Sequence, residues 1–102
     1  MVTKALYVPL KPKPGKEADL KEFLANGLGL AQEEPETISW YAFEQSDGTM
    51  AIFDTFEGDE GRQAHLDGKV AEALMANADE LLAEAPQIHH VDVLAAKVPG
   101  DG

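Results

Sequence analysis

The sequence TISWYAFEQSDGTMAIFDTF, residues 37–56, decides the fold. It contains two runs rich in aromatic and β-branched residues, and the dipeptide Asp47-Gly48 lies between them. Asp-Gly tolerates the positive φ angles that a tight hairpin turn requires. The stretch is therefore predicted to form a β-hairpin.

Neither strand of this hairpin has a polar face. Side chains alternate between the two faces of a strand, so Trp40 points away from Tyr41 and Phe43, yet both sets are apolar. In the second strand, Ile52 and Phe53 likewise occupy opposite faces. An antiparallel sheet that helices cover on one side is usually polar on the other side. We therefore expect a second copy of the same sheet to cover the second face.

The rest of the chain predicts two helices and two further strands. Residues 3–10 and 87–98 read as strands, whereas residues 16–32 and 60–82 carry apolar side chains three and four positions apart, as amphipathic helices do. Asn77 could divide the second helix in two. The order β-α-β-β-α-β is that of the ferredoxin-like unit. The predicted fold class is α+β, with both helices on one face of a four-stranded antiparallel sheet.

Length and charge narrow the possible functions. The 102 residues predict a single domain over residues 1–98 and a flexible C-terminal tail over residues 99–102. A net charge of −11 argues against nucleic acid and anionic membrane surfaces as partners. The chain has no cysteine, which excludes disulfides and thiolate sites. No apolar run approaches the length of a signal or membrane-spanning segment, so we expect a cytoplasmic location.

Four segments resemble the antibiotic biosynthesis monooxygenase domain family. They are ETISWYAF at 36–43, IFDTF at 52–56, GRQAHL at 61–66 and VDVLAAK at 91–97, and the resemblance extends over residues 6–97. It implies a dimeric α+β barrel, in which two sheets pack face to face as a homodimer. Members that are enzymes, many of them described as quinol monooxygenases, oxidise phenols, anthrones or hydroquinones with O₂. The resemblance therefore implies an oxidoreductase that uses no cofactor.

His65 is the candidate catalytic residue. It matches a position at which many members of that family carry histidine, and an imidazole can accept a phenolic proton near neutral pH. The structural alternative is a histidine hydrogen-bonded to a carbonyl or a carboxylate. An enzyme would hold His65 in a closed pocket with one ring nitrogen unpaired. A binding protein would keep the pocket but turn His65 to solvent, and a purely structural dimer would fill the pocket with side chains.

Four aromatic residues are candidates for substrate binding: Trp40, Phe53, Tyr7 and Phe43. They could line a slot for a planar substrate, and the simpler alternative is that they are core and dimer-interface aromatics. Alternation prevents Trp40 and Phe43 from lining the same pocket. Spacing alone leaves open which set faces the helices.

The remaining ionisable residues suggest no metal site. Asp54 lies inside an apolar strand, where an ion pair with Arg62, the only arginine, would satisfy it. His89 and His90 are adjacent in a strand and point to opposite faces, which makes a poor metal pair. The haem-degrading members of the family carry a haem-ligating histidine further along the second helix, where this chain has ALM at residues 73–75.

The resemblance thus implies a cofactor-independent monooxygenase that oxidises a quinol-like or polyketide-like aromatic with O₂. The alternative is a non-catalytic homodimer that binds a small hydrophobic ligand. A third possibility is a structural dimer without a ligand.

Overall fold

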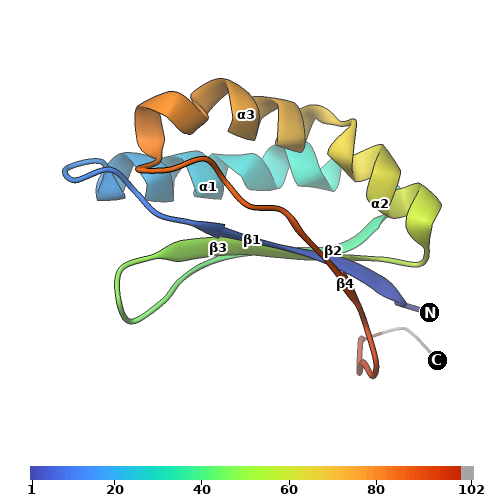
Figure 1. Ribbon diagram of the computed structural model, residues 1–102. Coiled ribbons are helices and arrows are strands. Elements are labelled where there is room, and N and C mark those ends of the chain that lie inside the picture. The colour runs from blue at the N-terminus through green and yellow to red at the C-terminus, as the bar shows by residue number, and fades with distance from the viewer. Residues whose placement is uncertain (100–102) are drawn as a thin grey trace.

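A four-stranded antiparallel sheet carries all the helices on one of its faces in the computed structural model, which describes residues 1–99 (Figure 1). The elements in chain order are β1 (Lys4–Leu10), α1 (Glu17–Gln32), β2 (Thr37–Glu44), β3 (Met50–Phe56), α2 (Asp59–Leu66), α3 (Lys69–Leu81) and β4 (His89–Asp92). The strand order is β2-β3-β1-β4. The predicted α+β, ferredoxin-like fold is confirmed. Residues 100–102, most of the tail predicted to be flexible, lie outside the described residues.

The turn between β2 and β3 depends on one glycine. Gly48 has a φ of 90°, and its N–H donates a hydrogen bond of 3.0 Å to the carbonyl of Gln45. Asp47 keeps an ordinary negative φ, and its carboxylate accepts a hydrogen bond of 2.9 Å from the N–H of Thr49. Only the glycine therefore supplies the left-handed conformation that the turn needs, while the aspartate supplies an acceptor.

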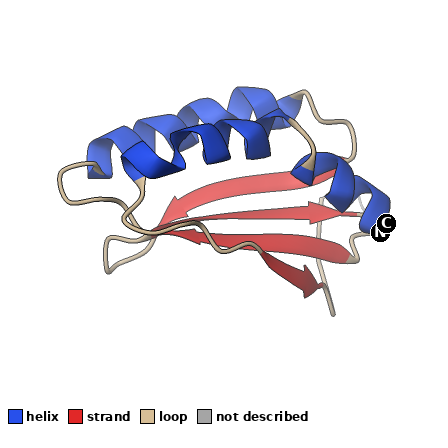
Figure 2. Cartoon of the chain, turned by 45° about the horizontal axis from the view of Figure 1, so that its top comes forward, coloured by secondary structure: helices blue, strands red, loops and turns tan. Residues whose placement is uncertain are grey.

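The structure decides which face of the hairpin meets the helices. Trp40 packs against the core between sheet and helices, and Ile52 is buried there. Tyr41 and Phe43 lie on the other face, where they are 58% and 40% exposed. The helices leave this second face uncovered (Figure 2). A row of paired residues runs across it from Tyr41 through Phe53 to Tyr7.

The core lies between the inner face of the sheet and helices α1 and α3. Its buried members are Val8, Leu10, Leu20, Leu24, Met50, Ile52, Leu74, Ala78, Leu81 and Leu82. Within residues 1–99, no buried core residue follows Leu82. Strand β4 therefore adds hydrogen bonds to the sheet but no side chain to the core.

Two predicted boundaries were wrong. The second helix breaks at Gly68, between α2 and α3, because Gly68 takes an extended ψ of −173° and becomes the N-cap of α3. Asn77 instead stays helical, and its side-chain amide donates 2.8 Å to the carbonyl of Ala73. Strand β4 is shorter than predicted because β1 pairs with it only over the four residues Lys4 to Tyr7.

None of the helices in the described part of the chain has both the length and the hydrophobicity that crossing a bilayer requires.

Candidate functional site

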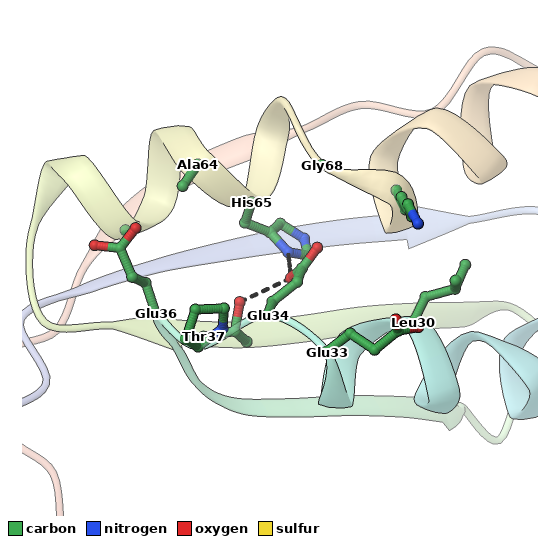
Figure 3. A pocket seen from close by; sticks show the side chains of 11 residues that line it. Leu30, Glu33, Glu34, Glu36, Thr37, Ala64, His65 and Gly68 are labelled. Atoms are coloured by element: carbon green, nitrogen blue, oxygen red, sulfur yellow. Dashed lines mark hydrogen bonds and ion pairs between the residues drawn. The ribbon is translucent and has the colours of Figure 1, made fainter.

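His65 lies in the last turn of α2 and points inward, toward the sheet (Figure 3). Its side chain is 6% exposed, and its ring lies 5.4 Å from the ring of Phe56 on β3. Helix α2 thus holds an ionisable ring at a position that is nearly closed to water. A buried ring of this kind needs polar partners.

Two carboxylates flank the His65 ring. Nδ1 lies 2.6 Å from Oε1 of Glu34, which belongs to the connection between α1 and β2. Nε2 lies 2.9 Å from Oδ2 of Asp54 on β3. The two atoms are close enough for an ion pair, but the contact does not have the geometry of a hydrogen bond. The expectation that one ring nitrogen faces the pocket unpaired is therefore wrong. The arrangement matches the structural alternative, a histidine held by carboxylates.

The charges of these partners decide the protonation of His65. Burial lowers the pKa of the imidazolium, but contact with Asp54, and then with Glu34, raises it by more, so that the pKa lies above its ordinary 6.5. The two carboxylates thus favour the protonated ring, in which both N–H groups point at a carboxylate. An imidazolium has no lone pair with which to accept a proton from a substrate.

The predicted ion pair between Asp54 and Arg62 is wrong. Asp54 is only 1% exposed and lies on the helix-facing side of β3, next to His65. The guanidinium of Arg62 contacts Asp59 Oδ1 at 3.0 Å and the carbonyls of Ala5 and Val91 at 3.4 Å and 3.3 Å. Arg62 therefore ties α2 to the backbones of β1 and β4 and does not enter the site.

Glu34 is the functional candidate that the sequence prediction missed. Its Oε1 accepts from His65 and also from the hydroxyl of Thr37, at 2.8 Å. Its Oε2 is buried and accepts no hydrogen bond from any residue that the structure describes. Gly68 makes room for this oxygen, because a Cβ at that position would lie 2.8 Å from Oε2.

A pocket of about 290 Å³ opens beside this cluster, between the end of α1, the start of β2 and the junction of α2 with α3 (Figure 3). Its lining residues are Leu30, Glu33, Glu34, Pro35, Glu36, Thr37, Gly61, Ala64, His65, Gly68 and Lys69. Glu34 and His65 thus form part of the wall of a pocket that a small molecule could enter.

A second, more apolar pocket of about 90 Å³ lies between α1, α3 and the sheet, and Leu30 lines both pockets. Its wall includes the indole of Trp40, which packs at 3.4 Å from the position that a Cβ on Gly27 would occupy. The indole Nε1 is buried, and within residues 1–99 it has no hydrogen-bond acceptor. A buried N–H without a partner is costly, and a ligand that carries an acceptor would satisfy it.

The four aromatic residues predicted to bind substrate do not share a site. Trp40 lines the pocket of about 90 Å³ between α1, α3 and the sheet. Phe43 borders a different pocket, together with Lys21 and Leu24 of α1. Tyr7 and Phe53 are neighbours on the outer face of the sheet, and Phe43 lies on that face as well. Alternation along β2 and β3 separates the two groups, as the spacing required.

The histidines at the start of β4 stand apart from this site. The ring of His89 lies 5.9 Å from the ring of Tyr7, and His90 is exposed. Among residues 1–99, no group of three or more acidic or histidine side chains is arranged to hold a metal ion.

Comparison with known proteins identifies relatives mainly through structure. No family model matches the chain, and no curated protein does. The chain is 49% identical to the NE2512 protein of unknown function from Nitrosomonas europaea, over 97% of this chain and 96% of that one, with a TM-score of 0.93. This identity over the full length shows common descent.

More distant structures share the fold. A “putative antibiotic biosynthesis monooxygenase” from Nitrosomonas europaea is 14% identical over 90% of each chain, with a TM-score of 0.79. A protein of the same description from Caulobacter crescentus is 16% identical over 92% of each chain, with a TM-score of 0.78. The chain belongs to the family of the NE2512 protein and has the fold of the antibiotic biosynthesis monooxygenases.

Proposed function

We propose that this protein is a cytoplasmic, cofactor-independent monooxygenase that oxidises a quinol-like or polyketide-like aromatic with O₂. For a quinol, one oxygen atom enters the ring and the other leaves as water, while the substrate supplies all four electrons and ends as a hydroxyquinone. The protein would bind the ring, help remove its hydroxyl proton and keep bulk water away.

The unpaired indole N–H of Trp40 carries the proposal. The Trp40 side chain lines an apolar pocket whose other walls are hydrocarbon side chains of α1, α3 and β3, with Asn26 as a polar member, and its Nε1 is buried without an acceptor among residues 1–99. An apolar pocket beside an unpaired donor suits a flat ring that carries an oxygen acceptor. The pocket is smaller than the cavity of about 150 Å³ that can hold benzene. A ring would therefore extend past Leu30 into the neighbouring pocket beside Glu34.

One observation favours the alternative, a homodimer that binds a small hydrophobic ligand without chemistry. Both ring nitrogens of His65 are engaged by carboxylates, so the predicted proton acceptor is occupied. Catalysis by His65 would require one of these contacts to open. The pockets themselves serve ligand binding in either case.

We further propose that the outer face of the sheet forms a homodimer interface. Tyr41 and Phe43 are exposed there, beside Phe53 and Tyr7 in the adjoining strands. An exposed apolar patch of this kind marks an interaction site on a soluble protein. A second copy of the sheet would cover it with matching residues.

The test is oxygen uptake with a panel of hydroquinones and anthrones, measured above their autoxidation in buffer. The wild type is compared with Trp40→Phe, which removes the N–H but keeps an aromatic ring. Tyr41→Phe, which removes a polar group on the opposite face, is the matched control. We expect enzymatic uptake that falls at least tenfold in kcat/KM in Trp40→Phe, about 1.4 kcal/mol of barrier, and stays unchanged in Tyr41→Phe.

Absence of uptake with every substrate, combined with binding of the same compounds, would replace the monooxygenase by the ligand-binding alternative. Uptake that is equal in Trp40→Phe and wild type would remove the indole from the site.

A further inference from the structure

We propose that Glu34 binds the hydroxyl group of the aromatic ligand and takes its proton, with His65 as the residue that positions Glu34. This inference deepens the proposed function and rests on it for the identity of the substrate. It assigns the acceptor role to a side chain in the connection between α1 and β2.

The two oxygens of Glu34 differ in what they contact. Oε1 is saturated, because it accepts from His65 Nδ1 at 2.6 Å and from Thr37 Oγ1 at 2.8 Å. Oε2 is buried against Gly68 and is free of hydrogen bonds to residues 1–99. A carboxylate that is held at one oxygen and free at the other is oriented to receive one further donor.

The free oxygen belongs to a residue of the pocket wall. Glu34, Gly68 and His65 all line the pocket of about 290 Å³. Leu30 lines both this pocket and the one beside the Trp40 indole. A ligand that extends past Leu30 would accept a hydrogen bond from Trp40 at one end and present a hydroxyl to Glu34 at the other.

Charge within the cluster favours a proton-donating ligand. Glu34 and the nearly inaccessible Asp54 both contact the ring of His65, so two carboxylates share a single histidine, which can compensate at most one negative charge. Burial disfavours an uncompensated charge. A proton delivered to Glu34 would remove one of the two carboxylate charges, and Asp54 would remain as the partner of the protonated His65 ring.

The chemical step balances as follows for a quinol. The O–H bond of the ligand breaks, its proton goes to Oε2 of Glu34, and the electron pair stays on the quinolate oxygen. The electron-rich quinolate then reduces O₂ and forms a C–O bond to it, which gives a peroxide on the ring. The proton on Glu34 is returned to the outer oxygen of this peroxide, and the oxygenated ring carbon gives up its own proton. The O–O bond breaks, the outer oxygen leaves as water with these two protons, and the ring ends as the hydroxyquinone.

Anaerobic binding tests this without requiring turnover. Trp40 is the only tryptophan, so its indole N–H produces a single cross-peak in a ¹⁵N NMR spectrum. We would titrate the protein with hydroquinone and with 1,4-dimethoxybenzene, which has the same ring but no hydroxyl donor. The wild type should bind hydroquinone at least tenfold more tightly, and only hydroquinone should shift the His65 ring resonances.

Glu34→Gln is the informative variant. Its amide oxygen can still accept from His65 and Thr37, while its NH₂ replaces Oε2 and presents a donor. The tenfold preference for hydroquinone should disappear, and binding of benzoquinone, which has only acceptors, should improve. Glu72→Gln, the same charge change on an exposed part of α3, should keep the wild-type preference.

The outcomes separate this inference from the proposed function. Equal binding of hydroquinone and its dimethyl ether by the wild type overturns the role of Glu34 even if the protein consumes oxygen. A preference that depends on Glu34 without oxygen uptake supports the role of Glu34 and overturns the oxygenase. If Glu34→Gln does not fold, the role of Glu34 is judged from the wild type alone, by its preference for hydroquinone over 1,4-dimethoxybenzene and by the shift of the His65 ring resonances. Failure of both ligands to bind overturns both proposals.

Discussion

Replacing His65 by leucine should destabilise the fold severely. The substitution leaves Asp54 with 1% exposure and no compensating charge. Removing one partner of a buried ion pair costs about 3–5 kcal/mol. We add nothing for Glu34, whose side chain is 16% exposed and can turn toward solvent. The expected loss is a large share of the roughly 5–15 kcal/mol that stabilises a typical domain.

Urea unfolding, followed by the fluorescence of Trp40, measures this loss. For a chain of this size the midpoint should fall by about 1 M or more. The double variant His65→Leu/Asp54→Leu should recover most of the loss, because apolar side chains then replace both members of the pair. His90→Leu is the control, since His90 is exposed and should change stability little. A loss below about 1 kcal/mol in His65→Leu would refute the buried pair.

Three further predictions follow from the same structure. The pKa of folded His65 is raised above 6.5, so the contribution of His65 to stability should be complete below pH 6.5 and should disappear as the pH rises through the pKa of the folded state. Urea midpoints measured from below pH 6.5 upward should therefore decrease in the wild type. They should not show this decrease in His65→Leu. Gly68→Ala should cost about 1–3 kcal/mol, because its Cβ would lie 2.8 Å from Glu34 Oε2. Gly29→Ala, whose Cβ would meet nothing within 4 Å, should instead gain up to about 1 kcal/mol, and urea unfolding of both variants measures the difference. Tyr41→Asp should convert the proposed dimer to a monomer of 11.0 kDa in light scattering, and a wild type that already has this mass would contradict the interface.

Local patterns were sufficient to predict the fold. Two runs of aromatic and β-branched residues around Asp47-Gly48 identify the hairpin, and three- and four-residue spacing identifies the helices. The break at Gly68 was misplaced because its cause is tertiary. The glycine is needed at that point to make room for the carboxylate of Glu34, a residue that is distant in sequence.

The candidate site was only partly predictable. Alternation already placed Asp54 on the same face as Ile52. Only the structure shows that the helices cover this face, so that the partner of Asp54 comes from the helical layer. The partner turned out to be His65 rather than Arg62, since the direction of each side chain depends on how α2 packs on the sheet. Nothing in the sequence around Glu34 indicated a functional role, because an acidic residue that follows a helix is usually exposed to solvent.

The absence of core side chains in β4 has a consequence along its neighbour β1. In an antiparallel sheet, successive residues of an inner strand bond alternately to one neighbour and to the other. Between Lys4 and Tyr7, β1 therefore directs every second amide toward β3, which is held by the core, and the others toward β4, which is not. Local opening of an edge requires less free energy than global unfolding. Amide hydrogen exchange should consequently alternate between slow and fast along a single continuous strand.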